Sequence, residues 1–162
     1  MFYLITGLLG AALVAADQWS KAWALRVLEP VGTMPAICGI IDYTFLPNGN
    51  NGAAWGIFAG KQTLLVLVTG AMMLAILAAM LFYRRRLSRP EFVALTLVLA
   101  GGIGNLIDRV GQGYVVDFIQ FSFWKTFPIF NVADICVTTG VALLVLCILF
   151  ANDKKEKSRE AA

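Results

Sequence analysis

The sequence predicts an all-α membrane protein in which a four-helix transmembrane bundle carries a small extracytoplasmic β-sheet platform and a short interfacial segment. The chain has 162 residues, 59% of them hydrophobic, and its mean hydropathy is +0.77. A soluble domain is nearer half apolar. Four stretches are also long enough to cross a bilayer, which takes about 20 residues. The chain is short enough to form a single integral membrane domain over residues 1–162.

The four spans are expected at about residues 2–25, 62–83, 90–108 and 131–151. The first begins with an uncharged stretch, which is also typical of a cleavable signal peptide. No basic residues precede that stretch and the apolar pattern resumes after Asp17, so we expect it to be retained. The second contains no charged residue. The third follows Ser88-Arg89-Pro90-Glu91, a capping-box pattern that marks the start of a helix.

The basic residues predict how the bundle is oriented. The loop at residues 84–89 holds four arginines, and the tail at 152–162 holds three lysines and one arginine. The two other connecting segments are much poorer in them. By the positive-inside rule, the arginine loop and both termini face the cytoplasm. The basic tail is then a topological anchor, and no nucleic-acid partner is expected.

The two outer segments, 26–61 and 109–130, differ from the spans in composition. The first is rich in glycine and proline and contains a β-prone run at 40–45, which predicts a small sheet over the membrane surface. The second contains an extended apolar pattern at 114–119 and several aromatic residues. It either extends that sheet or lies flat at the interface, where Trp and Tyr are favoured.

Three aspartates are expected in one layer near the outer membrane face. A helix rises about 1.5 Å per residue, so Asp17 and Asp108 each lie about 24 Å from the cytoplasmic end of their span. Asp134 lies in the first turn of a helix that begins outside. Because an ionisable residue in a bilayer costs several kcal/mol, such residues indicate a functional site by default.

Two polar groups of these spans have both a structural and a functional interpretation. Asp17 and Lys21 are four residues apart and share a helix face, which favours a structural ion pair with a neighbouring helix. Asn105, Asp108 and Arg109 also share a face. They either grip a substrate backbone or lipid headgroup, or hold helices together by polar contacts.

The chain has no histidine, so general acid–base chemistry falls to carboxylates, Lys, Tyr or Cys. Asp117 interrupts an apolar extended stretch, and Asp134 follows Asn131 at a helix start, where the helix dipole also favours an acid. Two close carboxylates can share a proton and hydrolyse an amide through water. The three cysteines are scattered at Cys38, Cys136 and Cys147, so neither a disulfide framework nor a zinc site is expected. No cofactor is expected either.

Three other functions compete with carboxylate hydrolysis. A Ser–Lys protease is disfavoured because Ser20 and Lys21 point about 100° apart on a helix, and nothing around Ser122 and Lys125 supports that role. An ion-coupled transporter would place its acids near the midplane on broken helices. In a purely structural subunit, Asp117 would be dispensable.

Five short motifs in a fixed order resemble a known family. The family is bacterial lipoprotein signal peptidase, also called signal peptidase II, and the resemblance covers all four spans and both outer segments. The motifs are Asp17-Gln18-Trp19-Ser20-Lys21, Asn50-Asn51-Gly52-Ala53-Ala54, Gly104-Asn105-Leu106-Ile107-Asp108-Arg109, Val115-Val116-Asp117-Phe118 and Phe130-Asn131-Val132-Ala133-Asp134.

The resemblance implies a membrane-embedded aspartyl endopeptidase that cleaves prolipoproteins just before a diacylglyceryl-modified cysteine, with Asp117 and Asp134 as its catalytic pair. It also implies a place in the bacterial cytoplasmic membrane among its lipids, and globomycin as an inhibitor; we expect a monomer. Trp55-Gly56 departs from the family's common Phe-Ser. Substrate-binding or supporting roles are implied for Asn50, Asn105, Asp108, Arg109, Asn131, Asp17 and Lys21.

Overall fold

The computed structural model describes residues 1–52, 58 and 60–160, and within these it contains four helices and one three-stranded sheet. The elements are α1 Phe2–Leu28, β1 Thr33–Ile37, β2 Ile41–Thr44, α2 Gln62–Phe82, α3 Arg89–Gln112, β3 Ile119–Phe121 and α4 Val132–Glu160. Each helix is long and apolar enough to cross a membrane, α4 over Val132–Phe150. The predicted fold class is confirmed. Trp55-Gly56 and the two alanines of the Asn50 motif lie outside the described residues.

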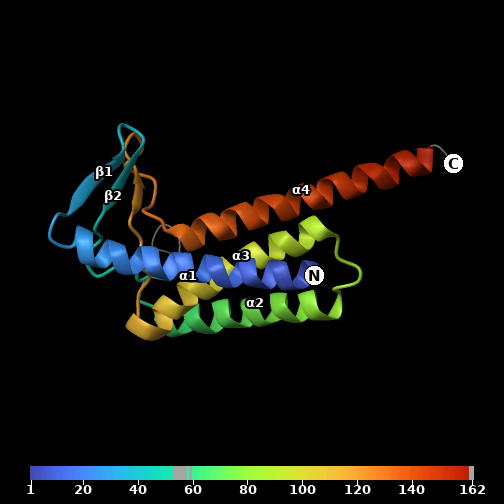
Figure 1. Ribbon diagram of the computed structural model, residues 1–162, viewed down its shortest axis with the longest axis horizontal. Coiled ribbons are helices and arrows are strands. Elements are labelled where there is room, and N and C mark those ends of the chain that lie inside the picture. Colours follow the sequence, from blue (N-terminus) through green and yellow to red (C-terminus); the bar gives the residue numbers. More distant parts are fainter. Residues whose placement is uncertain (53–57, 59, 161–162) are drawn as a thin grey trace.

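The helices run side by side with the sheet at one end of the bundle (Figure 1). The N-terminus, the connection between α2 and α3, and the end of α4 lie at the opposite end. The helix α3 packs against α1, α2 and α4. Polar residues on α3 can therefore contact side chains from the other helices.

Local sequence signals set both ends of α3. Ser88 caps its start, since the Ser88 amide donates to Glu91 Oε2 at 2.7 Å and the Glu91 amide donates to Ser88 Oγ at 3.4 Å. This confirms the capping box. The helix ends at Gly113, whose φ of 81° is the left-handed conformation that terminates helices. It therefore continues one turn beyond Asp108, where the third span was expected to end.

The sheet joins the two outer segments. Its order is β1–β2–β3, both pairings are antiparallel, and Tyr43 of β2 lies opposite Ile119 of β3. The segment after α3 thus extends the sheet, which was one of the two expected arrangements. A small apolar core under the sheet contains Leu28, which is fully buried, with Ala24 and Phe118. Because Phe118 is fixed in this core, the residue before it, Asp117, is held at the end of the helix bundle.

Glycines allow α3 and α4 to approach closely along their shared length. A Cβ added at Gly101 would collide with the carbonyl oxygen of Ala133 and lie 2.8 Å from Val137 Cγ2. A Cβ at Gly140 would lie 2.7 Å from the carbonyl oxygen of Ala94. Small residues let transmembrane helix backbones come this near to each other. The backbone at the start of α4 is therefore in close contact with α3.

Replacing Gly101 by alanine is expected to destabilise the protein by about 1–3 kcal/mol, because the added methyl group overpacks a backbone contact that cannot yield easily. The matched control is Gly111→Ala in the same helix, where an added Cβ meets nothing within 4 Å. That control is expected to be neutral or slightly stabilising. Thermal unfolding in detergent measures both variants, and equal unfolding temperatures would contradict the proposed close contact.

Candidate active site

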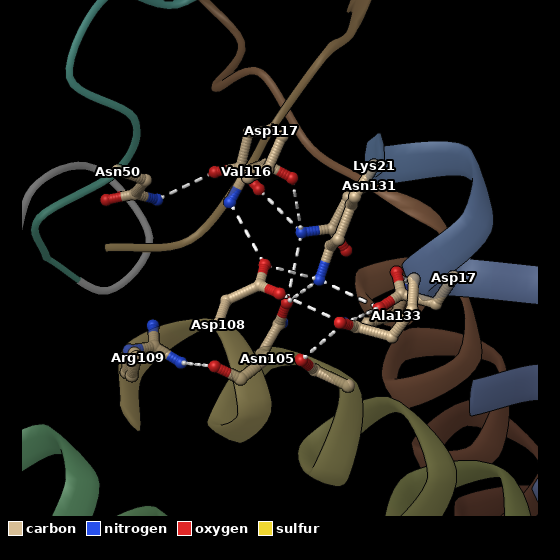
Figure 2. Close-up of polar contacts among 12 residues, drawn as sticks. Asp17, Lys21, Asn50, Asn105, Asp108, Arg109, Val116, Asp117, Asn131 and Ala133 are labelled. Carbon is tan, nitrogen blue, oxygen red and sulfur yellow. Dashed lines mark hydrogen bonds and ion pairs between the residues drawn. The ribbon is translucent and has the colours of Figure 1, made fainter. Parts of the chain in front are cut away.

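A buried lysine lies at the centre of the polar layer. Lys21 Nζ contacts Asp17 Oδ2 at 2.8 Å, Asp108 Oδ2 at 2.9 Å and Asn105 Oδ1 at 3.0 Å. Its side chain is only 3% exposed. The predicted ion pair between Asp17 and Lys21 is confirmed, and it ties α1 to α3 through Asp108 (Figure 2). We call Asp17, Lys21 and Asp108 the support cluster.

The two acids of the support cluster each hold the backbone next to another aspartate. Asp17 Oδ1 accepts a hydrogen bond from the Ala133 amide at 2.9 Å, and Ala133 precedes Asp134. Asp108 Oδ2 accepts one from the Val116 amide at 3.1 Å, and Val116 precedes Asp117. The support cluster therefore fixes the backbone positions from which Asp117 and Asp134 project.

Three asparagines hold the carboxylates of Asp117 and Asp134. Asn131 Nδ2 donates to Asp117 Oδ1 at 2.6 Å and to Asn105 Oδ1 at 3.0 Å. Asn105 Nδ2 donates to Asp134 Oδ1 at 2.8 Å, and Asn50 Nδ2 donates to Asp117 Oδ2 at 2.9 Å. Since the side chains of Asn131 and Asn105 bond to each other and each donates to one carboxylate, they form a continuous bridge between the two acids, and the Asn131 backbone amide also donates to Asp134 Oδ2 at 3.1 Å.

Both carboxylates line one cavity of about 460 Å³. Its polar wall also includes Asn50, Asn105 and Arg109. Its remaining wall is mostly apolar and comes from α4 and from the aromatic segment that follows β3. The support cluster lies behind this wall and does not line the cavity. The arrangement suits an extended, largely apolar ligand that presents a reactive bond to two acids.

Arg109 carries positive charge at the cavity wall. Its Nη2 donates to the carbonyl oxygen of Gly52 at 3.1 Å and its Nη1 to that of Asn105 at 3.4 Å. Its Nε is buried and has no hydrogen-bond partner among the described residues. Asn105 and Asp108 join α3 to α1 through Lys21, which is the structural interpretation of the third-span cluster, and Asn105 and Arg109 also line the cavity.

Burial changes the acidity of Asp117, which is only 4% exposed. Its pKa is raised from 3.8 to about 7, first by the loss of solvent and second by the negative charge of Asp134. The hydrogen bonds from Asn50 and Asn131 oppose this rise without cancelling it. A solvated edge-strand charge, the simplest alternative for Asp117, is therefore excluded. At neutral pH this group can act as a proton donor or acceptor.

The structure brings all nine predicted site residues into one connected region, and it also shows a residue that sequence reasoning missed. Gln18 Nε2 donates to Asp108 Oδ1 at 2.9 Å, to the Gly104 carbonyl oxygen at 3.1 Å and to Asp17 Oδ2 at 3.2 Å. An amide beside an acid inside an apolar span was the signal that could have identified it.

Other chemistries find no support in the described part of the chain. Lys125 Nζ pairs with Asp42 Oδ2 at 2.5 Å on the exposed side of the sheet, so it is not paired with Ser122. Ser20 Oγ donates to the carbonyl oxygen of Asp17 at 2.8 Å within its own helix. Across residues 1–52, 58 and 60–160, no three metal-ligating side chains gather into a cluster.

The chain is similar to several known proteins in sequence and in fold. Residues 9–150 match the family described as signal peptidase (SPase) II. A protein of Clostridium acetobutylicum named lipoprotein signal peptidase is 40% identical to this chain, in an alignment that covers 88% of this chain and 92% of that protein. A protein of the same name from Geobacillus thermodenitrificans is also 40% identical, and the alignment covers 88% of each. A solved bacterial membrane enzyme superimposes with a TM-score of 0.82 at 34% identity, covering 93% of this chain and 91% of that one.

Proposed function

The chain belongs to the signal peptidase II family, and from this premise we propose that it is an aspartyl endopeptidase that cleaves diacylglyceryl-modified prolipoproteins just before the lipidated cysteine. One observation carries the proposal: Asp117 and Asp134 line the same cavity and are bridged by Asn131 and Asn105. Two acids held in this way can share one proton and activate water without a metal or a nucleophilic side chain.

The raised pKa of Asp117 supports its role as the protonated member of the pair, with Asp134 ionised. Asp134 removes a proton from water as the water oxygen attacks the scissile carbonyl carbon, and Asp117 gives its proton to the carbonyl oxygen. The tetrahedral intermediate then collapses. The C–N bond breaks, the proton held by Asp134 passes to the leaving amine, and the proton on the intermediate returns to Asp117.

The surrounding residues divide into two roles. Asn50, Asn105, Asn131 and Arg109 orient the carboxylates or donate to substrate carbonyl groups, because they contact the acids or line the cavity. The support cluster fixes the backbone next to Asp117 and Asp134 through the hydrogen bonds that Asp17 and Asp108 accept. These positions supply the rigid second layer that catalytic geometry requires.

The proposed topology places the site near the outer face of the bacterial cytoplasmic membrane. The N-terminus, the arginine-rich connection and the end of α4 lie at one end of the bundle, and the sheet lies at the other end (Figure 1). Asp117 lies two residues before β3 of that sheet. The positive-inside rule then puts both termini in the cytoplasm. A diacylglyceryl group stays in the outer leaflet, so it presents the cleavage site at this depth. We propose that the chain acts as a monomer among membrane lipids, and that globomycin-type inhibitors bind the same cavity.

The direct test is cleavage of a purified diacylglyceryl-modified precursor by the purified protein in detergent or lipid. Mass spectrometry is expected to show a product whose N-terminus is the lipidated cysteine. The control substrate is the same precursor with that cysteine replaced by serine, which cannot be lipidated and is expected to remain intact. If the folded protein leaves the lipidated precursor intact, or cleaves it elsewhere, the proposed function is wrong.

Cleavage is expected to weaken as the pH rises above about 7. The raised pKa means that Asp117 keeps its proton below this pH and loses it above, and the proposed mechanism needs that proton. Above the pKa, kcat/KM should fall about tenfold per pH unit. A profile from about pH 5 to 9 in one detergent tests this, and a rate that stays constant to the upper limit would contradict the assignment.

The same shift predicts a change in stability. The folded protein retains a proton on Asp117 that the unfolded chain releases near the ordinary value of 3.8. The unfolding free energy should therefore fall as the pH rises from 3.8 to about 7. Above about pH 7, Asp117 should cause no further change in the unfolding free energy.

A further inference from the structure

The cavity continues along α4 beyond the two acids. Thr138 and Thr139 line it together with Ile135 and Val137. Thr138 follows Asp134 by four residues, so it lies on the same helix face and about 6 Å further from the start of α4. The aromatic segment after β3 lines the same cavity. Two hydroxyl groups therefore lie in an otherwise apolar stretch of the cavity, inside the membrane-spanning part of α4.

These hydroxyls have no hydrogen-bond partner within the described part of the chain. Other threonines in the bundle do: Thr6 Oγ1 donates to the carbonyl oxygen of Phe2 at 3.2 Å, and Thr96 Oγ1 to that of Phe92 at 2.8 Å. A hydroxyl removed from water without a hydrogen bond costs free energy. Thr138 and Thr139 are thus free to bond a ligand that fills the cavity and excludes water from it.

A signal peptide brings a matching set of acceptors, an argument that rests on the proposed function. A helix that crosses the membrane from the cytoplasm ends near the two acids, and its last four carbonyl groups have no intrahelical donor. The chain must also leave the helix there for the scissile bond to reach both acids. Unpaired backbone groups cost several kcal/mol each in hydrocarbon, so they require partners from the protein.

We propose that Thr138 and Thr139 are substrate-binding residues whose hydroxyls donate hydrogen bonds to the unpaired backbone carbonyls of the signal peptide before the cleavage site. They replace the intrahelical bonds that the substrate loses as it unwinds. The unwound residues then cross the apolar part of the cavity without leaving the membrane. The substrate reaches Asp117 and Asp134 in an extended conformation.

The variant that removes both hydroxyls and keeps the side-chain shape is Thr138→Val with Thr139→Val. Loss of two hydrogen bonds is expected to lower kcat/KM about tenfold, mainly through a higher KM. Thr138→Ser with Thr139→Ser keeps the hydroxyls and should retain activity near wild type. The matched control is Thr69→Val in α2, because the Thr69 hydroxyl also lacks a partner among the described residues but does not line the cavity.

A second substrate distinguishes peptide carbonyls from the ester carbonyls of the lipid. A dialkylglyceryl ether analogue of the precursor has no ester carbonyls. If the hydroxyls bind the peptide, the double valine variant loses the same factor on both substrates. A loss confined to the ester substrate would overturn the assignment to the peptide.

Equal kinetics of the double valine variant and wild type on both substrates would also overturn the proposal, provided that their unfolding temperatures agree. If the double serine variant loses as much kcat/KM as the double valine variant, the effect is due to packing and not to the hydroxyls. That result would overturn the proposal as well. Wild-type cleavage of the ester substrate is the baseline. Its failure would contradict the proposed function and not this inference alone.

Discussion

Replacing Asp117 or Asp134 by asparagine is expected to lower the cleavage rate of a diacylglyceryl-modified precursor about ten-thousandfold. Asparagine keeps the size of the side chain and one oxygen acceptor, so the bridge through Asn131 and Asn105 can largely persist. It cannot accept the proton of water or donate one to a carbonyl oxygen as a carboxyl group does. The loss should therefore appear in kcat, with little change in the binding of substrate.

The two substitutions should not be additive. If the acids act as one unit, the double variant loses about as much activity as either single variant. The matched control is Asp42→Asn, since Asp42 pairs with Lys125 on the exposed side of the sheet and does not line the cavity. Retention of a tenth or more of the wild-type rate by either single variant would remove that residue from the catalytic pair. If the fold-loss of the double variant equals the product of the two single fold-losses, the acids act independently and do not share a proton.

The shared layer of Asp17 and Asp108 could be predicted from the sequence because it follows from local distances. The length of each apolar run before Asp17 and Asp108 places them in the second half of their helices, and the capping box fixes where α3 begins. These signals need only helix rise and side-chain polarity. The structure accordingly places both acids in the same polar layer, joined through Lys21.

The backbone amides that the supporting acids hold could not be predicted, because these contacts join distant segments. Asp17 accepts from the amide of Ala133, which lies 116 residues away in the sequence. No local pattern indicates which backbone amide a buried carboxylate will reach. The same limit applies to the contacts of Asp117, because its extended stretch does not indicate which residues will cover it. Its burial arises because Phe118 packs into the core beneath the sheet and Asn131 approaches from α4.

The second large effect is expected for Lys21→Met. Lys21 is the cation between Asp17 and Asp108, and all three side chains are almost completely buried. Methionine fills a similar volume but leaves two buried carboxylates without a cation. Breaking a buried ion pair by removing one partner costs about 3–5 kcal/mol. For a chain of this size, that corresponds to a fall of about 10 °C in the unfolding temperature.

The matched control for this prediction is Lys125→Met, which breaks the other ion pair of the described residues. The Lys125 side chain is 54% exposed, so solvent screens its pairing with Asp42, and the substitution should cost at most about 1 kcal/mol. A triple variant, Asp17→Asn with Lys21→Met and Asp108→Asn, should recover part of the lost stability, because it removes the buried charges together with their partner. It should not recover activity, because amides in place of these carboxylates hold the Ala133 and Val116 amides more weakly. If Lys21→Met and Lys125→Met unfold at the same temperature, the support cluster does not stabilise the fold, and the positions of Asp117 and Asp134 must depend on the asparagine bridge alone.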